Sequence, residues 1–200
     1  MSHNGGICLA LQMYINETQL DKILWYFWRK EKKKFALITM ILFYGGMRIS
    51  ELLTTKFEDY NLKKRWIYLN NVKGLNNGAS QRIAYYPSYV EPYIIDHIKF
   101  YGLKKGDWMF QAHYEKEHYL DRTYYLKHLK EAGLETGVGP ITPHVLRKSF
   151  GVNVTRKAKD LRVTQMLLGH RNARTTLQYY LPYLNEDVER KYIEIYESHK

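Results

Sequence analysis

The apolar run FALITMILFY, residues 35–44, constrains the fold of this chain more than any other feature of the sequence. A membrane-spanning helix needs roughly 20 such residues, and this run has about half that number. The run therefore predicts a helix buried in the core of a globular domain. Gly45 and Gly46 follow directly, and glycine is the residue that most often ends a helix, so we expect the helix to stop there.

Helical patterns occupy most of the remaining chain. Thr18 or Asn16 is suited to cap a helix through LDKILWYFWRK, and the lysines at 32–34 turn the chain into the apolar helix. MRISELLTTKF predicts a short helical turn. From Tyr89 onward the apolar spacing is helical, with short loops marked by Gly, Pro or Asn. The predicted helices are YVEPYIIDHIKFYG, LDRTYYLKHLKEAG, PHVLRKSFGVNVTRKA, RVTQMLLG, ARTTLQYYL and EDVERKYIEIYESHK.

Two β-rich pieces, RWIYLNN and QRIAYYP, are joined by VKGLNNGAS, whose Gly and Asn residues favour a turn. They predict a hairpin with a long tip. The expected fold class is therefore mainly α with one small antiparallel β-sheet. No repeat or linker interrupts the pattern, so we expect residues 1–200 to form a single domain, with flexible residues at 1–16.

The charge balance points to an acidic partner. The chain has 31 Lys+Arg against 20 Asp+Glu, a formal net charge of +11, and a pI near 9.5. Nucleic acid is the first candidate for such a partner. The single cysteine, Cys8, excludes an internal disulfide and a Cys-rich metal site, which favours a reducing intracellular compartment. GGICLALQMYI lacks a basic flank and does not read as a signal peptide.

Several cationic and imidazole side chains stand where predicted elements begin or end. Arg48 follows the Gly-Gly pair, Lys73 lies at the hairpin tip, His144 and Arg147 open a helix after Pro143, and His170 follows a glycine. Helix N-termini and turn amides carry positive potential, so these groups are suited to converge on a phosphate. Taken singly, each is more often a solvated surface group or a structural histidine.

Three segments of the chain together resemble the signature motifs of the tyrosine recombinase (phage integrase) family: GGMRISELL at 45–53, HVLRKSF at 144–150 and LLGHRNARTTLQYY at 167–180. They occur in the family's order, and the resemblance covers roughly the last four-fifths of the chain. In its length and in the segments GMRISELL and LGHRN, the chain is most similar to the short fimbrial phase-switch inverters. The resemblance implies the family's catalytic-domain fold, with the separate N-terminal core-binding domain absent.

The resemblance also implies roles for individual residues. Arg48 and Arg147 would bind the scissile phosphate, and Glu51 would help hold the site together. His144 is the candidate general base. Lys148 stands where many family members have a second histidine.

Three further roles come from the hairpin and the third motif. Lys73 would be the general acid for the leaving 5′ hydroxyl, with Lys63 and Lys64 as alternatives because the hairpin is long. His170 would hydrogen-bond the phosphate. Tyr179, nine residues after His170, would be the nucleophile rather than Tyr180.

The implied reaction is a transesterification on DNA. A tyrosine oxygen attacks phosphorus, forms a 3′-phosphotyrosyl link and releases a 5′ hydroxyl, so no cofactor and no metal are required. A phenol has a pKa near 10, so a base must take its proton. The implied partners are a double-stranded DNA recombination site, a homo-tetramer formed partly through the last helix, and accessory DNA-bending proteins. The implied location is the cytoplasm, on the DNA of a prokaryotic cell or of a virus or plasmid host, with no membrane partner.

Other classes of function remain open at the level of the sequence. RVTQMLLGHRNARTTLQYY also reads as two short helices with a turn between them, as in a helix-turn-helix regulator that binds DNA without cleaving it. A type IB topoisomerase-like enzyme would share the nucleophile but would relax supercoils without strand exchange. A catalytically inactive accessory subunit is the third rival, and the complete set of candidate residues argues against it.

Overall fold

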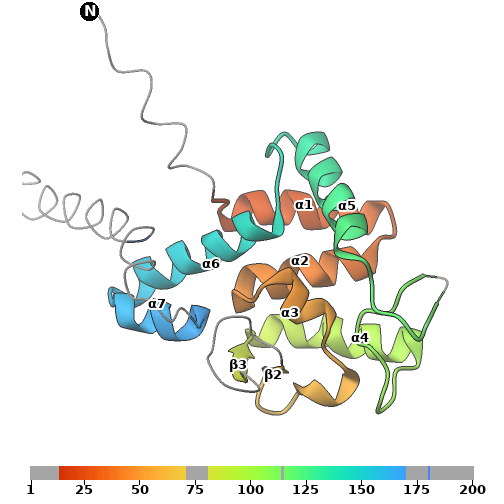
Figure 1. Ribbon diagram of the computed structural model, residues 1–200. Coiled ribbons are helices and arrows are strands. Elements are labelled where there is room, and N and C mark those ends of the chain that lie inside the picture. The colour runs from red at the N-terminus through yellow and green to blue at the C-terminus, as the bar shows by residue number, and fades with distance from the viewer. Residues whose placement is uncertain (1–13, 71–80, 114, 170–179, 181–200) are drawn as a thin grey trace, which may run out of the picture.

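The structure, a computed structural model, describes residues 14–70, 81–113, 115–169 and 180 (Figure 1). Within these residues it is mainly helical, with one small antiparallel sheet. The helices are α1 (Glu17–Arg29), α2 (Lys33–Gly45), α3 (Ile49–Leu53), α4 (Glu91–Tyr101), α5 (Arg122–Glu135), α6 (Pro143–Ala158) and α7 (Leu161–Leu168), and the strands are β1 (Tyr60–Asn61), β2 (Trp66–Leu69) and β3 (Arg82–Tyr85). Short 3-10 turns lie at Phe57–Asp59 and Ser88–Val90.

Asn16, one of the two caps that the sequence offered, is the N-cap of α1. The Asn16 side chain accepts a hydrogen bond from the Gln19 backbone N–H at 2.9 Å, and the Gln19 side chain accepts one from the Asn16 N–H at 3.0 Å. This reciprocal pair satisfies two backbone donors that a helix N-terminus otherwise leaves free. Asn16, rather than Thr18, therefore sets the start of the helix.

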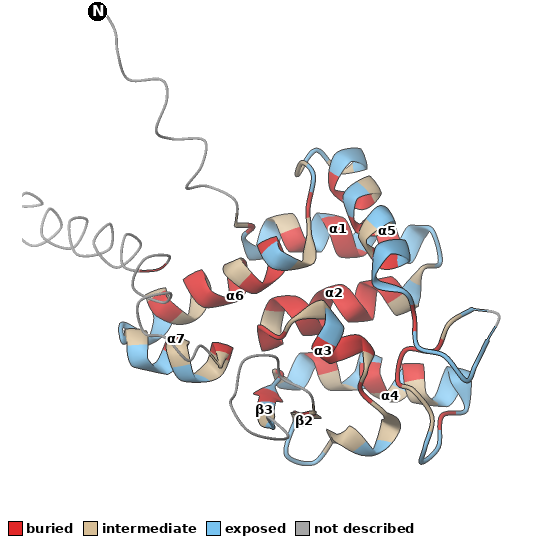
Figure 2. Cartoon of the chain, viewed as in Figure 1, coloured by how far each residue is buried: buried red, intermediate tan, exposed pale blue. Residues whose placement is uncertain are grey.

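The apolar run forms α2, the central helix of the core, as predicted. Nearly all of its residues are buried, and it packs against α1 on one side and α6 on another (Figure 2). Gly46 caps the C-terminal end of the helix with a φ of 62°, the left-handed conformation that glycine adopts at least cost. A Cβ on Gly46 would lie 2.1 Å from a ring carbon of Phe150 in α6, so this position also requires the absence of a side chain.

The predicted hairpin is present as β2 and β3, and it carries a third strand. Trp66 pairs with Tyr85 and Leu69 with Arg82, while β1 adds Tyr60 opposite Ile67. The two-residue strand β1 was not predicted, because FEDYN has no alternating apolar pattern. The hairpin tip, residues 71–80, lies outside the described part of the chain.

Helices α6 and α7 carry the C-terminal part of the candidate site. They pack against each other, and α6 also packs against α2. A small apolar cluster joins α6 and α7: Phe150, Val152, Leu168 and Tyr180. The predicted helices over ARTTLQYYL and EDVERKYIEIYESHK fall outside the described residues, apart from Tyr180. Among the described helices, none is long and apolar enough to cross a membrane.

Candidate active site

A buried carboxylate, Glu51, joins two arginines from distant parts of the chain. Its Oε1 accepts a hydrogen bond from Arg48 Nη1 at 2.5 Å, and its Oε2 accepts bonds from the Arg48 backbone N–H at 2.8 Å and from Arg82 Nη2 at 2.9 Å. The Glu51 side chain is only 2% exposed. Burial raises the pKa of this carboxyl, but the charge of Arg82 and the hydrogen bonds from Arg48 outweigh burial and hold the pKa below its ordinary value. Glu51 is therefore an ionised link between the two guanidiniums.

Arg147 of α6 completes a cluster of three arginines. Its Nη1 donates to the Gly46 carbonyl at 2.6 Å and its Nη2 to the Leu168 carbonyl at 2.7 Å. Burial, together with the nearby positive charges of Arg48 and Arg82, lowers the pKa of Arg147 to about 10. Three guanidiniums around one carboxylate leave an excess of positive charge, which suits an anionic ligand.

The end of α7 is fastened to this cluster by its last carbonyls. Leu168 accepts from Arg147, and the preceding residue, Leu167, accepts from Arg82 Nη1 at 3.0 Å. Gly169 caps the helix with a φ of 65°. His170, the first residue beyond this cap, lies outside the described residues.

His144 lies on the first turn of α6, three residues before Arg147. Thr142 caps this helix by accepting a hydrogen bond from the Val145 backbone N–H at 3.3 Å. Burial first, and then the charges of Arg147 and Lys148, lower the pKa of His144. The imidazole is therefore neutral at neutral pH, the state in which it is able to accept a proton.

Of the two tyrosines in the third motif, the structure describes only Tyr180. Tyr180 is 4% exposed and packs over Gly151 of α6, where a Cβ would lie 2.3 Å from its ring. It also lies near enough to Arg147 to affect the pKa of that arginine. Tyr179 and Lys73, like His170, fall outside the described residues.

The structure thus brings together Arg48, Glu51 and Arg147, with His144 on the same helix as Arg147. Lys63 and Lys64, the alternatives to Lys73, are exposed in the turn between β1 and β2.

Sequence reasoning missed Arg82. On β3 it shares a face with the buried Ala84, whereas Ile83 and Tyr85 are exposed. Because apolar residues lie on both faces of this strand, their alternation does not reveal that Arg82 points inward. The only sequence signal was a basic residue inside a short strand beside a predicted phosphate site.

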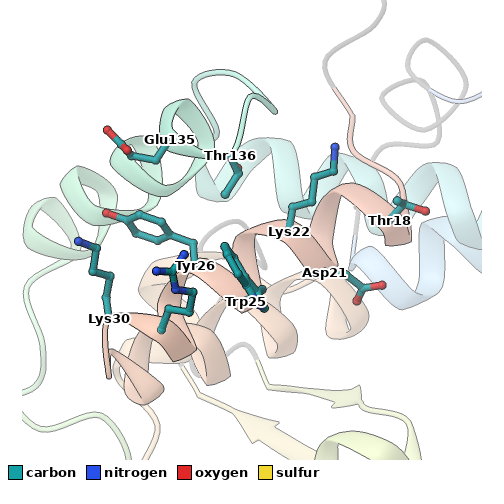
Figure 3. A pocket seen from close by; sticks show the side chains of 9 residues that line it. Thr18, Asp21, Lys22, Trp25, Tyr26, Lys30, Glu135 and Thr136 are labelled. Carbon is teal, nitrogen blue, oxygen red and sulfur yellow. The ribbon is translucent and has the colours of Figure 1, made fainter.

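A surface pocket lies elsewhere, between α1 and the end of α5 (Figure 3). It is lined by Thr18, Asp21, Lys22, Trp25, Tyr26, Arg29, Lys30, Glu135 and Thr136. The guanidinium of Arg29 lies 4.6 Å from the ring centroid of Trp25, a cation–π contact. None of the candidate catalytic residues that the structure describes, Arg48, His144 and Arg147, lines this pocket. In the described part of the chain, no group of His, Cys, Asp and Glu side chains is arranged to hold a metal ion.

Comparison with known proteins agrees with the motifs. The family model described as phage integrase family matches residues 13–186, so this chain belongs to the phage integrase family. It is 32% identical over 195 residues to tyrosine recombinase XerA of Pyrococcus furiosus, covering 94% of this chain and 64% of that protein. It is 31% identical over 156 residues to the type 1 fimbriae regulatory protein FimE of Escherichia coli K12, covering 74% of this chain and 73% of that protein.

Solved structures share the fold. A crystal structure of XerA recombinase matches with a TM-score of 0.75 at 23% identity, over 89% of this chain and 64% of that one. XerH site-specific recombinase, in a post-cleavage complex with a palindromic difH substrate, also matches with a TM-score of 0.75 at 23% identity, over 95% and 55%. The family resemblance and the predicted fold class are both confirmed. This chain spans between 51% and 64% of the length of the XerA relatives that it matches.

Proposed function

We propose that this chain is a site-specific DNA recombinase that cleaves and rejoins DNA through a 3′-phosphotyrosyl intermediate. The observation that carries the proposal is that Arg48 and Arg147, far apart in sequence, lie close enough for the charge of Arg48 to lower the pKa of Arg147. The buried Glu51 carboxylate holds Arg48, and the Leu168 carbonyl at the end of α7 holds Arg147. Guanidiniums are permanently charged and donate in a fixed fork, which suits the non-bridging oxygens of a phosphodiester.

Arg48 and Arg147 have different parts in this clamp. The Arg48 side chain is 36% exposed, so its remaining N–H donors are open to a phosphate. Arg147 is almost fully buried, and its two Nη atoms each hold a backbone carbonyl. Each Nη has two hydrogens, so Arg147 keeps donors for a phosphate oxygen while the carbonyls fix its plane. Charge that develops on phosphorus oxygens in the transition state is then met by donors already in place.

The chemical step moves two protons. Tyr179 Oη attacks phosphorus and its proton passes to neutral His144, while the bond from phosphorus to the 5′ oxygen breaks. The leaving 5′ oxygen takes a proton from Lys73 on the hairpin, and His170 donates a hydrogen bond to the phosphate. Because the phosphotyrosyl ester conserves the energy of the broken bond, rejoining to another 5′ hydroxyl needs no nucleotide cofactor.

Tyr180 is the second candidate nucleophile, because it lies within electrostatic reach of Arg147. Its phenol is buried against Gly151, and this packing favours a structural role. Tyr179 lies nine positions after His170, the family spacing, which supports Tyr179.

The proposed partner is a double-stranded DNA recombination site, bound by a homo-tetramer with accessory DNA-bending proteins in the cytoplasm. The XerH structure is of a recombinase bound to such a substrate, and the net charge of +11 supports DNA as the partner here.

A plasmid assay tests the proposal. Two copies of a duplex selected by this protein from a randomised library are placed in one supercoiled plasmid, and the products are sized after restriction. Wild type should invert or excise the segment between the copies. Relaxation without rearrangement would favour the topoisomerase-like alternative, and binding without any strand cleavage would favour the helix-turn-helix regulator.

Arg48→Ala should abolish rearrangement while DNA binding persists, since most of the affinity comes from other phosphate contacts. The fold should survive this change, because Glu51 keeps its bonds to Arg82 and to the backbone N–H of residue 48. Arg29→Ala, on the α1 pocket, is the matched control and should leave rearrangement intact. Rearrangement by Arg48→Ala at the wild-type level would show that the phosphate clamp is wrongly assigned.

A further inference from the structure

Arg82 connects the hairpin to two elements of the candidate site, α3 and α7. It is the first residue of β3, paired with Leu69 of β2, and therefore stands where β3 follows the hairpin loop that contains Lys73. Its side chain is only 10% exposed. A guanidinium so little exposed needs hydrogen-bond partners within the protein, and two of its nitrogens have them.

The guanidinium bridges two elements of the fold, α3 and α7. Nη2 donates to Glu51 Oε2 of α3 at 2.9 Å, and Nη1 donates to the Leu167 carbonyl of α7 at 3.0 Å. One planar group thus ties the carboxylate that orients Arg48 to the end of the helix that leads into His170.

Close packing reinforces this bridge. A Cβ added to Gly169 would lie 2.9 Å from Arg82 Cδ, so the aliphatic stem of Arg82 lies directly against the backbone of the α7 cap. Arg147 donates to the adjacent carbonyl, that of Leu168, at 2.7 Å. Two arginines therefore hold the last turn of α7, Arg82 from β3 and Arg147 from α6.

We propose that Arg82 is a positioning residue for DNA cleavage, which sets the end of α7 and the start of the third motif against the Glu51 carboxylate that orients Arg48. This inference rests on the proposed function. Arg82 acts through Glu51, Arg48 and the helix end, and not by contact with DNA.

Lysine is not equivalent to arginine at this position. A guanidinium offers two diverging Nη donors in a fixed plane, whereas an ammonium is a single centre at the end of a flexible stem. Lysine keeps the positive charge beside Glu51 but is unable to span both Glu51 Oε2 and the Leu167 carbonyl in the same geometry. Arg82→Lys therefore removes the bridge while retaining the charge.

The test uses the full chain and a nicked duplex selected by this protein, on which cleavage traps the covalent protein–DNA adduct. The initial rate of adduct formation is measured for wild type, Arg82→Lys and Arg65→Lys. Arg65 lies exposed in the turn before β2, so its substitution is a matched control. The measurement is repeated on a duplex with a neutral methylphosphonate at the cleaved position, where no charge on a non-bridging oxygen has to be stabilised.

Arg82→Lys should slow adduct formation about 100-fold on the phosphodiester, because small misplacements of catalytic groups have effects of this size. Its Kd for the duplex should stay within about threefold of wild type, since other phosphate contacts dominate affinity. On the methylphosphonate the rate defect should shrink to less than about tenfold, because Arg82 acts largely through the charge-neutralising Arg48. Arg65→Lys should match wild type on both duplexes.

Two results would overturn the assignment of Arg82 alone: a wild-type rate for Arg82→Lys on the phosphodiester, or an equal defect on both duplexes, which is the mark of a general structural fault. If wild type itself forms no adduct on a duplex that it binds, the proposed function fails and this inference fails with it.

Discussion

Glu51 is the residue that links two arginines of the site, through its buried carboxylate. It is buried, it accepts three hydrogen bonds, and two of its donors are arginine side chains. Replacing one member of a buried ionic group leaves the other charges without compensation and costs about 3–5 kcal/mol. The Glu51 carboxylate therefore stabilises the folded chain, and it also holds the Arg48 side chain in place through a hydrogen bond.

Glu51→Gln should lower the free energy of unfolding by about 3 kcal/mol, measured by urea denaturation at neutral pH. The pKa of Glu51 is depressed in the folded state, so its stabilisation is fully present above the ordinary glutamate pKa and is lost as pH falls through the lower folded pKa. The stability difference between wild type and Glu51→Gln should therefore narrow as the pH is lowered through that window. Glu117→Gln, at an exposed position, should show no such difference, and a Glu51→Gln protein as stable as wild type would contradict the buried charge network.

His144 makes a prediction about the rate of DNA cleavage against pH. Its pKa is lowered by burial and by the charges of Arg147 and Lys148. A general base works in its neutral form, so the acid limb of the rate profile should inflect below the ordinary histidine pKa. His144→Gln should slow cleavage about 100-fold or more and remove that limb. An unchanged acid limb in His144→Gln would assign the base to another group.

At the scale of the element, helix ends do most of the positioning. The Gly46 cap of α2 supplies a carbonyl to Arg147, and the Gly169 cap of α7 follows the two carbonyls held by Arg82 and Arg147. Both caps have left-handed backbone conformations and close neighbours. Gly46 therefore allows the end of α2 to approach Phe150, and Gly169 allows the end of α7 to approach Arg82.

Gly46→Ala should destabilise the fold more than Gly102→Ala. Both glycines cap a helix with a φ of 62°, but a Cβ at Gly102 meets nothing within 4 Å, whereas one at Gly46 lies 2.1 Å from Phe150. The left-handed backbone costs about 1–2 kcal/mol in each variant, and overpacking adds about 1–3 kcal/mol at Gly46 alone. Urea denaturation of the two variants isolates the packing contribution. Equal losses would mean that Phe150 moves aside without cost.

Elements with strong local signals were predictable from the sequence. The apolar run gave α2, Asn16 was one of two candidate caps for α1, and the turn chemistry of VKGLNNGAS indicated the β2–β3 hairpin. Strand β1 is only two residues long and owes its pairing to β2, so no local pattern marks it. Arg82 escaped notice for a related reason, because its partners Glu51 and Leu167 are 31 and 85 residues away in sequence.

At the scale of the whole molecule, the site is assembled from three regions of the chain on one helical core. Helix α2 ends at the site, α3 follows it, and α6 and α7 complete it from the C-terminal half (Figure 1). Motif order alone suggested which residues meet, and the structure places Arg48, Glu51 and Arg147 in one cluster. The arrangement agrees with membership of the phage integrase family, and the net charge of +11 favours the DNA that such a site would act on.

Covalent capture tests the central claim most directly. A nicked duplex bound by the protein is mixed with wild type, Tyr179→Phe or Tyr180→Phe, and protein–DNA adducts are resolved under denaturing conditions. We predict an adduct with wild type and with Tyr180→Phe, and none with Tyr179→Phe. Loss of the adduct only in Tyr180→Phe would move the nucleophile by one residue, and no adduct from wild type on the bound duplex would contradict the proposed recombinase chemistry.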